Sequence, residues 1–145
     1  MSAPETVLAF DFGLKRIGIA SGDSLTRSAA PRPAAVSGAA GPDWAAITRE
    51  VTSLRPARLI VGAPYNADGT EGPMTAAARA FAAELERRFA LPVHLVDERF
   101  SSLEATAALR QRRASGARRR RVTRADIDST AAAVILGRFF TGEGD

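Results

Sequence analysis

The sequence predicts a single α/β domain in which a mixed β-sheet is flanked by helices. Two observations predict this fold class. The first two apolar segments are joined by a short polar connection, as in a hairpin, and the later apolar segments alternate with segments of helical spacing. The 145 residues fit one domain, and the share of hydrophobic residues, 46%, is ordinary for a globular protein. We therefore assign residues 1–145 to one domain.

The first half of the chain predicts three strands and a helix. Residues 7–11 and 17–21 are short apolar segments, expected to form a buried hairpin. Residues 27–36 contain two prolines, which confine the segment to an edge strand or to irregular structure. Gly41-Pro42 is expected to open a helix, since proline fits a first helical turn. The residues expected on the inward face of this helix are Trp44, Ile47, Val51 and Leu54.

The second half alternates buried strands with helices. Strands are expected at residues 58–63 and 92–98, where apolar residues run almost without interruption. Between them Gly72-Pro73 opens a helix, whose expected inward residues are Met74, Ala77, Phe81, Leu85 and Phe89. Two further helices are each preceded by a capping box, formed by Ser101 with Glu104 and by Thr123 with Asp126. The first should end near residue 113, before a loop over residues 114–122, and the second near residue 140.

Composition limits the kinds of site that the chain can form. It has no cysteine and one histidine, His94, so a metal ion would be held mainly by carboxylates. The first residues lack a basic start with a long apolar stretch, and no apolar run approaches the roughly 20 residues of a membrane span. We therefore expect a cytoplasmic protein without a membrane partner.

The net charge of +4 is distributed unevenly. Eight arginines and no acidic residue lie between Ala105 and Ala125, which leaves 12 basic against 16 acidic residues elsewhere. A local basic patch of this kind suits a polyanion, because arginine pairs with phosphate through a planar fork of donors. A solvated arginine-rich loop is the alternative. On charge alone, contact with nucleic acid is favoured.

Two carboxylates stand at the ends of predicted strands. Asp11 ends the first strand and Glu98 the last, and ligands of open α/β sheets gather beyond the carboxyl ends of the strands. Asp97 and Glu98 cannot both face Asp11, because successive side chains of a strand point to opposite faces. We select Glu98, and expect Asp97 to pair with an arginine such as Arg99. The alternative for Asp11 is a turn aspartate before Phe12-Gly13.

Asp128 is the third candidate. Asp126 is explained by its capping box, whereas Asp128 heads an apolar stripe formed by Ala132, Ile135 and Phe139. A carboxylate in that position requires a partner, unless it is only a first-turn aspartate favoured by the helix dipole. A divalent ion shared by the three acids would satisfy them together. Ligation by carboxylate oxygens suits Mg²⁺ or Mn²⁺, and phosphodiester hydrolysis is the natural use of such a site.

Four stretches in order along the chain resemble the YqgF family, also called RuvX-type Holliday junction resolvases. They are DFGLKRIGIA (residues 11–20), VGAPYNADGTEGP (61–73), DERFSSLEA (97–105) and IDSTAAAVIL (127–136). The resemblance implies a ribonuclease H-like fold, an acidic triad and a role in nucleic-acid processing, often on the precursor of the small-subunit ribosomal RNA. It supports Asp11, Glu98 and Asp128 as the triad. The family usually has a lysine just upstream of the last aspartate, where this chain has Arg124.

The resemblance also implies that Lys15 and Arg16 flank the site and that the loop of residues 66–72 borders it. That loop is equally explained as a plain turn or as backbone that binds phosphate. The candidate catalytic and metal-binding residues are Asp11, Glu98 and Asp128. The candidate nucleic-acid contacts are Lys15, Arg16, Asn66, Arg99, Arg118, Arg119, Arg120, Arg121 and Arg124.

Several functions remain open. RNA is favoured over branched DNA, because symmetric junction cleavage calls for two sites, as in a two-fold dimer, and no dimer surface is evident. A monomer is therefore expected. An actin-like or sugar-kinase ATPase has a phosphate loop that resembles DFGLKRIG, but such proteins contain two of these domains. A nucleic-acid-binding module with little catalysis is the third reading.

Overall fold

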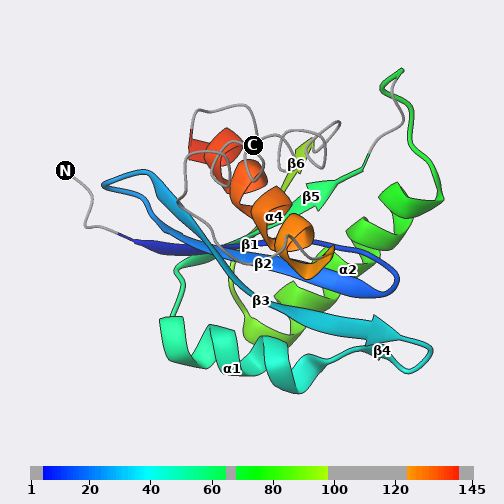
Figure 1. The fold of residues 1–145 in the computed structure, drawn as a ribbon, viewed down its shortest axis with the longest axis horizontal. Coiled ribbons are helices and arrows are strands. Elements are labelled where there is room, and N and C mark those ends of the chain that lie inside the picture. The colour runs from blue at the N-terminus through cyan, green and yellow to red at the C-terminus, as the bar shows by residue number, and fades with distance from the viewer. Residues whose placement is uncertain (1–4, 65–67, 98–123, 141–145) are drawn as a thin grey trace.

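The computed structural model describes residues 5–64, 68–97 and 124–140. These residues form a six-stranded sheet in the order β4-β3-β2-β1-β5-β6 (Figure 1). The strands are β1 (Thr6–Asp11), β2 (Arg16–Asp23), β3 (Ser28–Gly38), β4 (Gly41–Pro42), β5 (Arg58–Ala63) and β6 (Val93–Asp97). The helices are α1 (Trp44–Leu54), α2 (Pro73–Phe89) and α4 (Arg124–Phe140). Strands β1 to β4 pair antiparallel, and β1, β5 and β6 pair parallel. The predicted mixed α/β sheet is confirmed.

Helices cover both faces of the sheet (Figure 1). On one face α4 packs through Ile135 and Leu136 against Val7 and Ala9 of β1. On the opposite face α1 and α2 contribute buried residues to a cluster that includes Leu8 and Phe10 of β1. Alternate residues of β1 therefore belong to opposite faces, as the period of two in a strand requires. We refer to these as the α4 face and the α1–α2 face.

Strand β3 resolves the open expectation for the proline-bearing segment. The strand has eleven residues and pairs with β2 along most of its length, whereas β4 pairs only with Ser37 and Gly38 of β3. Over the described part of the chain, the outer edge of β3 around Pro31 and Pro33 therefore has no strand beside it. Proline lacks an amide proton, and it is tolerated at such an edge because no neighbouring strand needs a hydrogen bond from it. The edge-strand prediction is confirmed.

The predicted start of the first helix is wrong by two residues. Gly41-Pro42 forms the short strand β4, and α1 begins at Trp44. The helix is capped by Asp43, whose Oδ1 accepts a hydrogen bond from the Ala46 amide at 3.1 Å. The predicted inward face is confirmed: Ile47 is fully buried, and the other three predicted residues pack against the same core.

Helix α2 begins at Pro73 as predicted, but the residues buried in its first turns differ from the predicted ones. The buried residues there are Thr75 and Ala78, and Met74 and Ala77 are only half-buried. The reason is polar. Oγ1 of Thr75 accepts a hydrogen bond from the Gly72 amide at 3.0 Å and donates one to the Pro64 carbonyl at 2.9 Å. The predicted inward face was based on apolar side chains alone, so it did not include Thr75.

The remaining predictions concern the last strands and helices. Strand β5 has the predicted bounds, β6 covers residues 93–97, and α4 begins directly after Thr123 and ends at Phe140. The helix predicted from Ser101 and the loop over residues 114–122 lie outside the described residues. No helix within the described ranges is long and apolar enough to cross a membrane.

Candidate active site

Asp11 and Asp128 lie on the same side of the sheet, and a glycine of β2 contacts the elements that carry them. Asp11 ends β1 and pairs with Gly18 of β2. By strand alternation Asp11 shares the α4 face with Val7 and Ala9. Gly18 lies directly under α4: a Cβ atom added to it would be 2.0 Å from the carbonyl oxygen of Asp128. The end of β1 and the first turns of α4 therefore meet at Gly18.

The partner of Asp128 is Arg16. Nε of Arg16 donates a hydrogen bond to Oδ2 of Asp128 at 2.8 Å, and the two side chains are 31% and 23% exposed. The apolar stripe predicted below Asp128 is confirmed, since Ala132 and Ile135 are fully buried and Phe139 packs against the core. The sequence indicated that this carboxylate needs a partner but did not identify Arg16.

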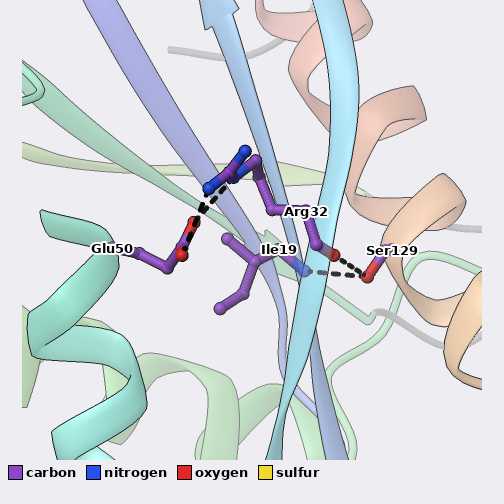
Figure 2. Close-up of polar contacts among 4 residues, drawn as sticks. All are labelled: Ile19, Arg32, Glu50 and Ser129. Carbon is purple, nitrogen blue, oxygen red and sulfur yellow. Dashed lines mark hydrogen bonds and ion pairs between the residues drawn. The ribbon is translucent and has the colours of Figure 1, made fainter. Parts of the chain in front are cut away.

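Ser129 fixes the same turn of α4 to the sheet. The pairing of β2 with β3 shifts between Ile17 and Ile19, so that one residue of β2 faces two of β3. At this bulge the Ser129 hydroxyl donates to the Arg32 carbonyl at 2.7 Å and lies 3.5 Å from the Ile19 amide (Figure 2). A helix side chain thus bridges a donor and an acceptor of two neighbouring strands. The residue next to Asp128 is held in place by the sheet itself.

Arg32 extends this connection to the opposite face. Figure 2 shows its carbonyl directed to Ser129 and its guanidinium directed to Glu50 of α1. Nε of Arg32 lies 2.8 Å from Oε1 of Glu50, and Nη2 lies 3.4 Å from Oε2. One residue of β3 therefore contacts helices on both faces, which fixes α4 relative to the rest of the core.

The connection between β1 and β2 is the most exposed part of the site. Lys15 is exposed, and its carbonyl accepts a hydrogen bond from the Ser37 amide at 2.8 Å. Leu14 beside it is 67% exposed. The predicted contacts Lys15 and Arg16 thus border the end of β1 that carries Asp11.

Asp97 faces away from Asp11. In β6, Val93 and Leu95 pack with the α1–α2 face, whereas Val96 belongs to the α4 face. Alternation therefore assigns Asp97 to the α1–α2 face. Its carbonyl accepts a hydrogen bond from Nη1 of Arg138 at 2.9 Å.

Other predicted site residues lie outside the part of the chain that is described. These are Glu98, Asn66, Arg99, Arg118, Arg119, Arg120 and Arg121. The expected pairing of Asp97 with Arg99 therefore also stays a prediction. Arg124 is the first residue of α4, but its side chain is not among those described. Within residues 5–64, 68–97 and 124–140, no three histidine or acidic side chains form a metal-binding group.

Sequence reasoning missed two residues that shape the site, Gly18 and Ser129. Gly18 had a usable signal, because an isolated glycine within an apolar strand marks a close backbone approach. Ser129 had none, because its role depends on a bulge between two strands that lie more than ninety residues away, as the separation of 97 between Ser129 and Arg32 shows.

Solved structures with the same fold define the class. A structure described as "T. thermophilus RuvC in complex with Holliday junction substrate" superposes with a TM-score of 0.58, covering 97% of this chain and 98% of that one at 16% identity. A second structure, described as "Thermus thermophilus RuvC structure", superposes with a TM-score of 0.57 at 15% identity, covering 97% of this chain and 98% of that one. The fold is therefore ribonuclease H-like.

The sequence comparisons show the family. A family model described as "RuvX: Holliday junction resolvase" matches residues 5–142. A protein of Legionella pneumophila named "Putative pre-16S rRNA nuclease" is 47% identical over 129 residues, 89% of this chain and 90% of its own. A protein of the same name from Salmonella paratyphi B is 43% identical over 136 residues, which cover 94% of this chain and 96% of the relative. The chain belongs to the RuvX (YqgF) family, and it is a nuclease, a hydrolase of phosphodiester bonds.

Proposed function

We propose that this chain is a nuclease dependent on Mg²⁺ or Mn²⁺ that processes the 5′ end of precursor 16S ribosomal RNA, with Asp11, Glu98 and Asp128 as its acidic triad. One observation supports the metal site: Asp11 lies on the face of the sheet that α4 covers, and its strand partner Gly18 contacts the backbone of Asp128. These two acids come from segments more than a hundred residues apart in the sequence.

The residues fit a hard divalent cation. Both described acids offer only carboxylate oxygens, which Mg²⁺ and Mn²⁺ prefer over the nitrogen and sulfur donors that zinc takes. Arg16 contacts Oδ2 of Asp128, and Oδ1 accepts no hydrogen bond from the described residues. We propose that the cation would bind through that oxygen. When bound, such an ion activates a water molecule and stabilises the leaving oxygen of a phosphodiester.

Glu98 is proposed as the third ligand in preference to Asp97. Alternation in β6 assigns Val96 to the face that carries Asp11 and Asp97 to the opposite face. A residue that follows Asp97 in the same strand pattern would return to the face of Asp11. This supports Glu98 as the ligand and leaves Asp97 a structural role.

The proposed RNA substrate rests on the names of the two bacterial relatives and on the residues predicted to contact nucleic acid. Lys15 and Arg16 adjoin Asp11, and the sequence adds Asn66, Arg99, Arg124 and the run of Arg118, Arg119, Arg120 and Arg121. Arginine and lysine contacts to phosphates hold the substrate in register without reading its sequence. We further propose that the protein acts as a monomer in the cytoplasm, where ribosomal RNA precursors are processed.

Cleavage of four-way DNA junctions is the second candidate function. It is favoured by the description of the family and by the RuvC structure solved with a Holliday junction. Symmetric cleavage of a junction requires two active sites, and a dimer would supply them. The two functions therefore differ in the oligomeric state that they demand.

A direct comparison of substrates tests the proposal. The purified chain is incubated with a precursor of 16S ribosomal RNA and with a four-way DNA junction, each with Mg²⁺ and with the metal chelated. We expect cleavage near the 5′ end of the RNA that requires the metal. Symmetric cleavage of the junction, with the RNA left intact, would support the second candidate. Cleavage that persists after chelation would contradict a metal-dependent site.

A further inference from the structure

We propose that Arg16 is a nucleic-acid contact controlled by the metal site. In the structure its guanidinium is paired with Asp128, and a divalent cation bound at the acids would release it to contact a substrate phosphate. The inference rests on the proposed function, because it requires a cation at Asp11 and Asp128. It adds that cation binding and substrate binding are coupled through one arginine.

The geometry of the pair differs from that of comparable pairs in the fold. Arg32 binds Glu50, and Arg58 binds Glu5, each through both Nε and Nη2. Arg16 binds Asp128 through Nε alone, and its Nη atoms donate to none of the residues that the structure describes. The outer part of the Arg16 fork therefore remains available. Its side chain is 31% exposed, so a phosphate approaching from solvent can reach it.

The pair is also easily exchanged. Ion pairs that are partly exposed contribute little net stability, because water and salt screen the attraction. A divalent cation brings two positive charges to the same carboxylate, which weakens the attraction of Asp128 for Arg16 and repels the guanidinium. A phosphate then offers Arg16 a better partner, because a planar guanidinium binds phosphate oxygens in bidentate fashion.

Only the side chain needs to move. The backbone of Arg16 belongs to β2, which pairs with Val36 at that position. The backbone of Asp128 is held over Gly18, and the neighbouring Ser129 hydroxyl is bonded to Arg32. Because both backbones are fixed, exchange of partners reduces to rotation of the Arg16 side chain. The acids keep their positions while the arginine changes its contact.

The test measures how many phosphate contacts form with and without the cation. Each phosphate neutralised on a single strand steepens the logarithmic dependence of affinity on salt by about 0.7. The affinity of the full chain for a single-stranded RNA oligonucleotide is titrated with NaCl, first with a chelator and then with Ca²⁺. Electrophoresis verifies that the RNA stays intact, and calorimetry measures whether the cation binds the protein.

Two variants and two matched controls separate Arg16 from general charge effects. Asp128→Ala removes the carboxylate and should free Arg16 without any cation, and Arg16→Gln removes the contact. The controls use the pair of Glu5 and Arg58, which lies at the opposite end of β1 from Asp11 and has a similar exposure of 35% for Arg58 and 29% for Glu5. Glu5→Ala and Arg58→Gln make the same changes of charge. The melting temperature of each variant verifies folding.

For the native chain, we expect the logarithmic dependence of RNA affinity on salt to steepen by about 0.7 when the cation is added. For Asp128→Ala, we expect the steeper dependence already in chelator. Arg16→Gln should show neither change, and both control variants should behave as the native chain. Equal slopes for the native chain and Asp128→Ala in chelator would overturn the inference, as would steepening that persists in Arg16→Gln. If calorimetry detects neither Ca²⁺ nor Mg²⁺ on the native chain, the proposed function is itself contradicted, and with it the control of Arg16.

Discussion

Gly18 and Asp128 are in direct backbone contact, at a separation that leaves no room for a side chain. A Cβ atom at position 18 would lie 2.0 Å from the carbonyl oxygen of Asp128 and 2.9 Å from the Ser129 amide nitrogen. Gly18→Ala must therefore push the start of α4 away from the hairpin. We expect a loss of about 1–3 kcal/mol in the free energy of unfolding, because overpacking of a tight contact costs this much.

The same displacement should separate Asp128 from Asp11 and reduce cleavage by about 100-fold, since a misplacement near 1 Å can cost that much. Urea denaturation and cleavage rates measure the two effects. Gly137→Ala is the matched control in α4, where an added Cβ meets no atom within 4 Å. It should stabilise the helix by up to about 1 kcal/mol and leave cleavage unchanged. Native stability and activity in Gly18→Ala would refute the role of this contact.

The second prediction compares two neighbouring acids. Glu98→Gln should reduce metal-dependent cleavage far more than Asp97→Asn, because strand alternation directs Asp97 to the face opposite Asp11. The two variants remove the same charge one residue apart, so each serves as the control of the other. Cleavage rates at saturating Mg²⁺ provide the measurement. The reverse order of damage would show that our assignment of faces at the end of β6 is wrong.

The third prediction concerns the run of Arg118, Arg119, Arg120 and Arg121, which lies outside the described residues and precedes α4. If this run holds the substrate backbone, replacing all four arginines by glutamine should weaken RNA binding equally across sequences. Removal of two phosphate contacts should flatten the salt slope by about 1.4. A salt titration in metal-free buffer measures it. An unchanged slope would identify a solvated loop.

The fourth prediction is a pH dependence on the exposed side of α2. Hydrogen bonds from Arg87 and then Arg88 lower the pKa of Glu84 from an ordinary 4.5 to about 2. Because the pKa is lower in the folded state, the contribution of this cluster to stability is complete above about pH 4.5 and is lost as the pH falls through 2. An NMR titration of Glu84 should give the low value. Arg87→Gln should raise it more than Arg88→Gln does, and an unshifted pKa in the native chain would contradict the cluster.

The sequence predicted the fold well because most elements are defined by local patterns. The hairpin, the apolar strand β5 and the start of α4 are each predicted from a few adjacent residues, and all three elements appear at the expected positions. The errors arose where a polar side chain overrode the apolar pattern. Asp43 moved the start of α1, and Thr75 turned the buried face of α2.

The candidate site was only partly predictable for a related reason. Asp11 and Asp128 could be identified singly, since one ends a strand and the other heads an apolar stripe. The contacts that unite them are not local: Arg16 and Asp128 are 112 residues apart in sequence, and Ser129 acts at a bulge between β2 and β3. No periodicity encodes such contacts. They follow from the path of α4 across the completed sheet.

The central proposal is that Asp11 is a ligand of a divalent ion required for cleavage, and one variant tests it most directly. Asp11→Asn keeps the shape of the side chain at the end of β1 but removes the charge that a cation needs. We predict that Mg²⁺-dependent cleavage of the ribosomal RNA precursor falls at least about 100-fold, since a bound ion contributes several kcal/mol to the transition state. The melting temperature in chelator should remain near that of the native chain. Undiminished cleavage by the folded Asp11→Asn variant would contradict the account.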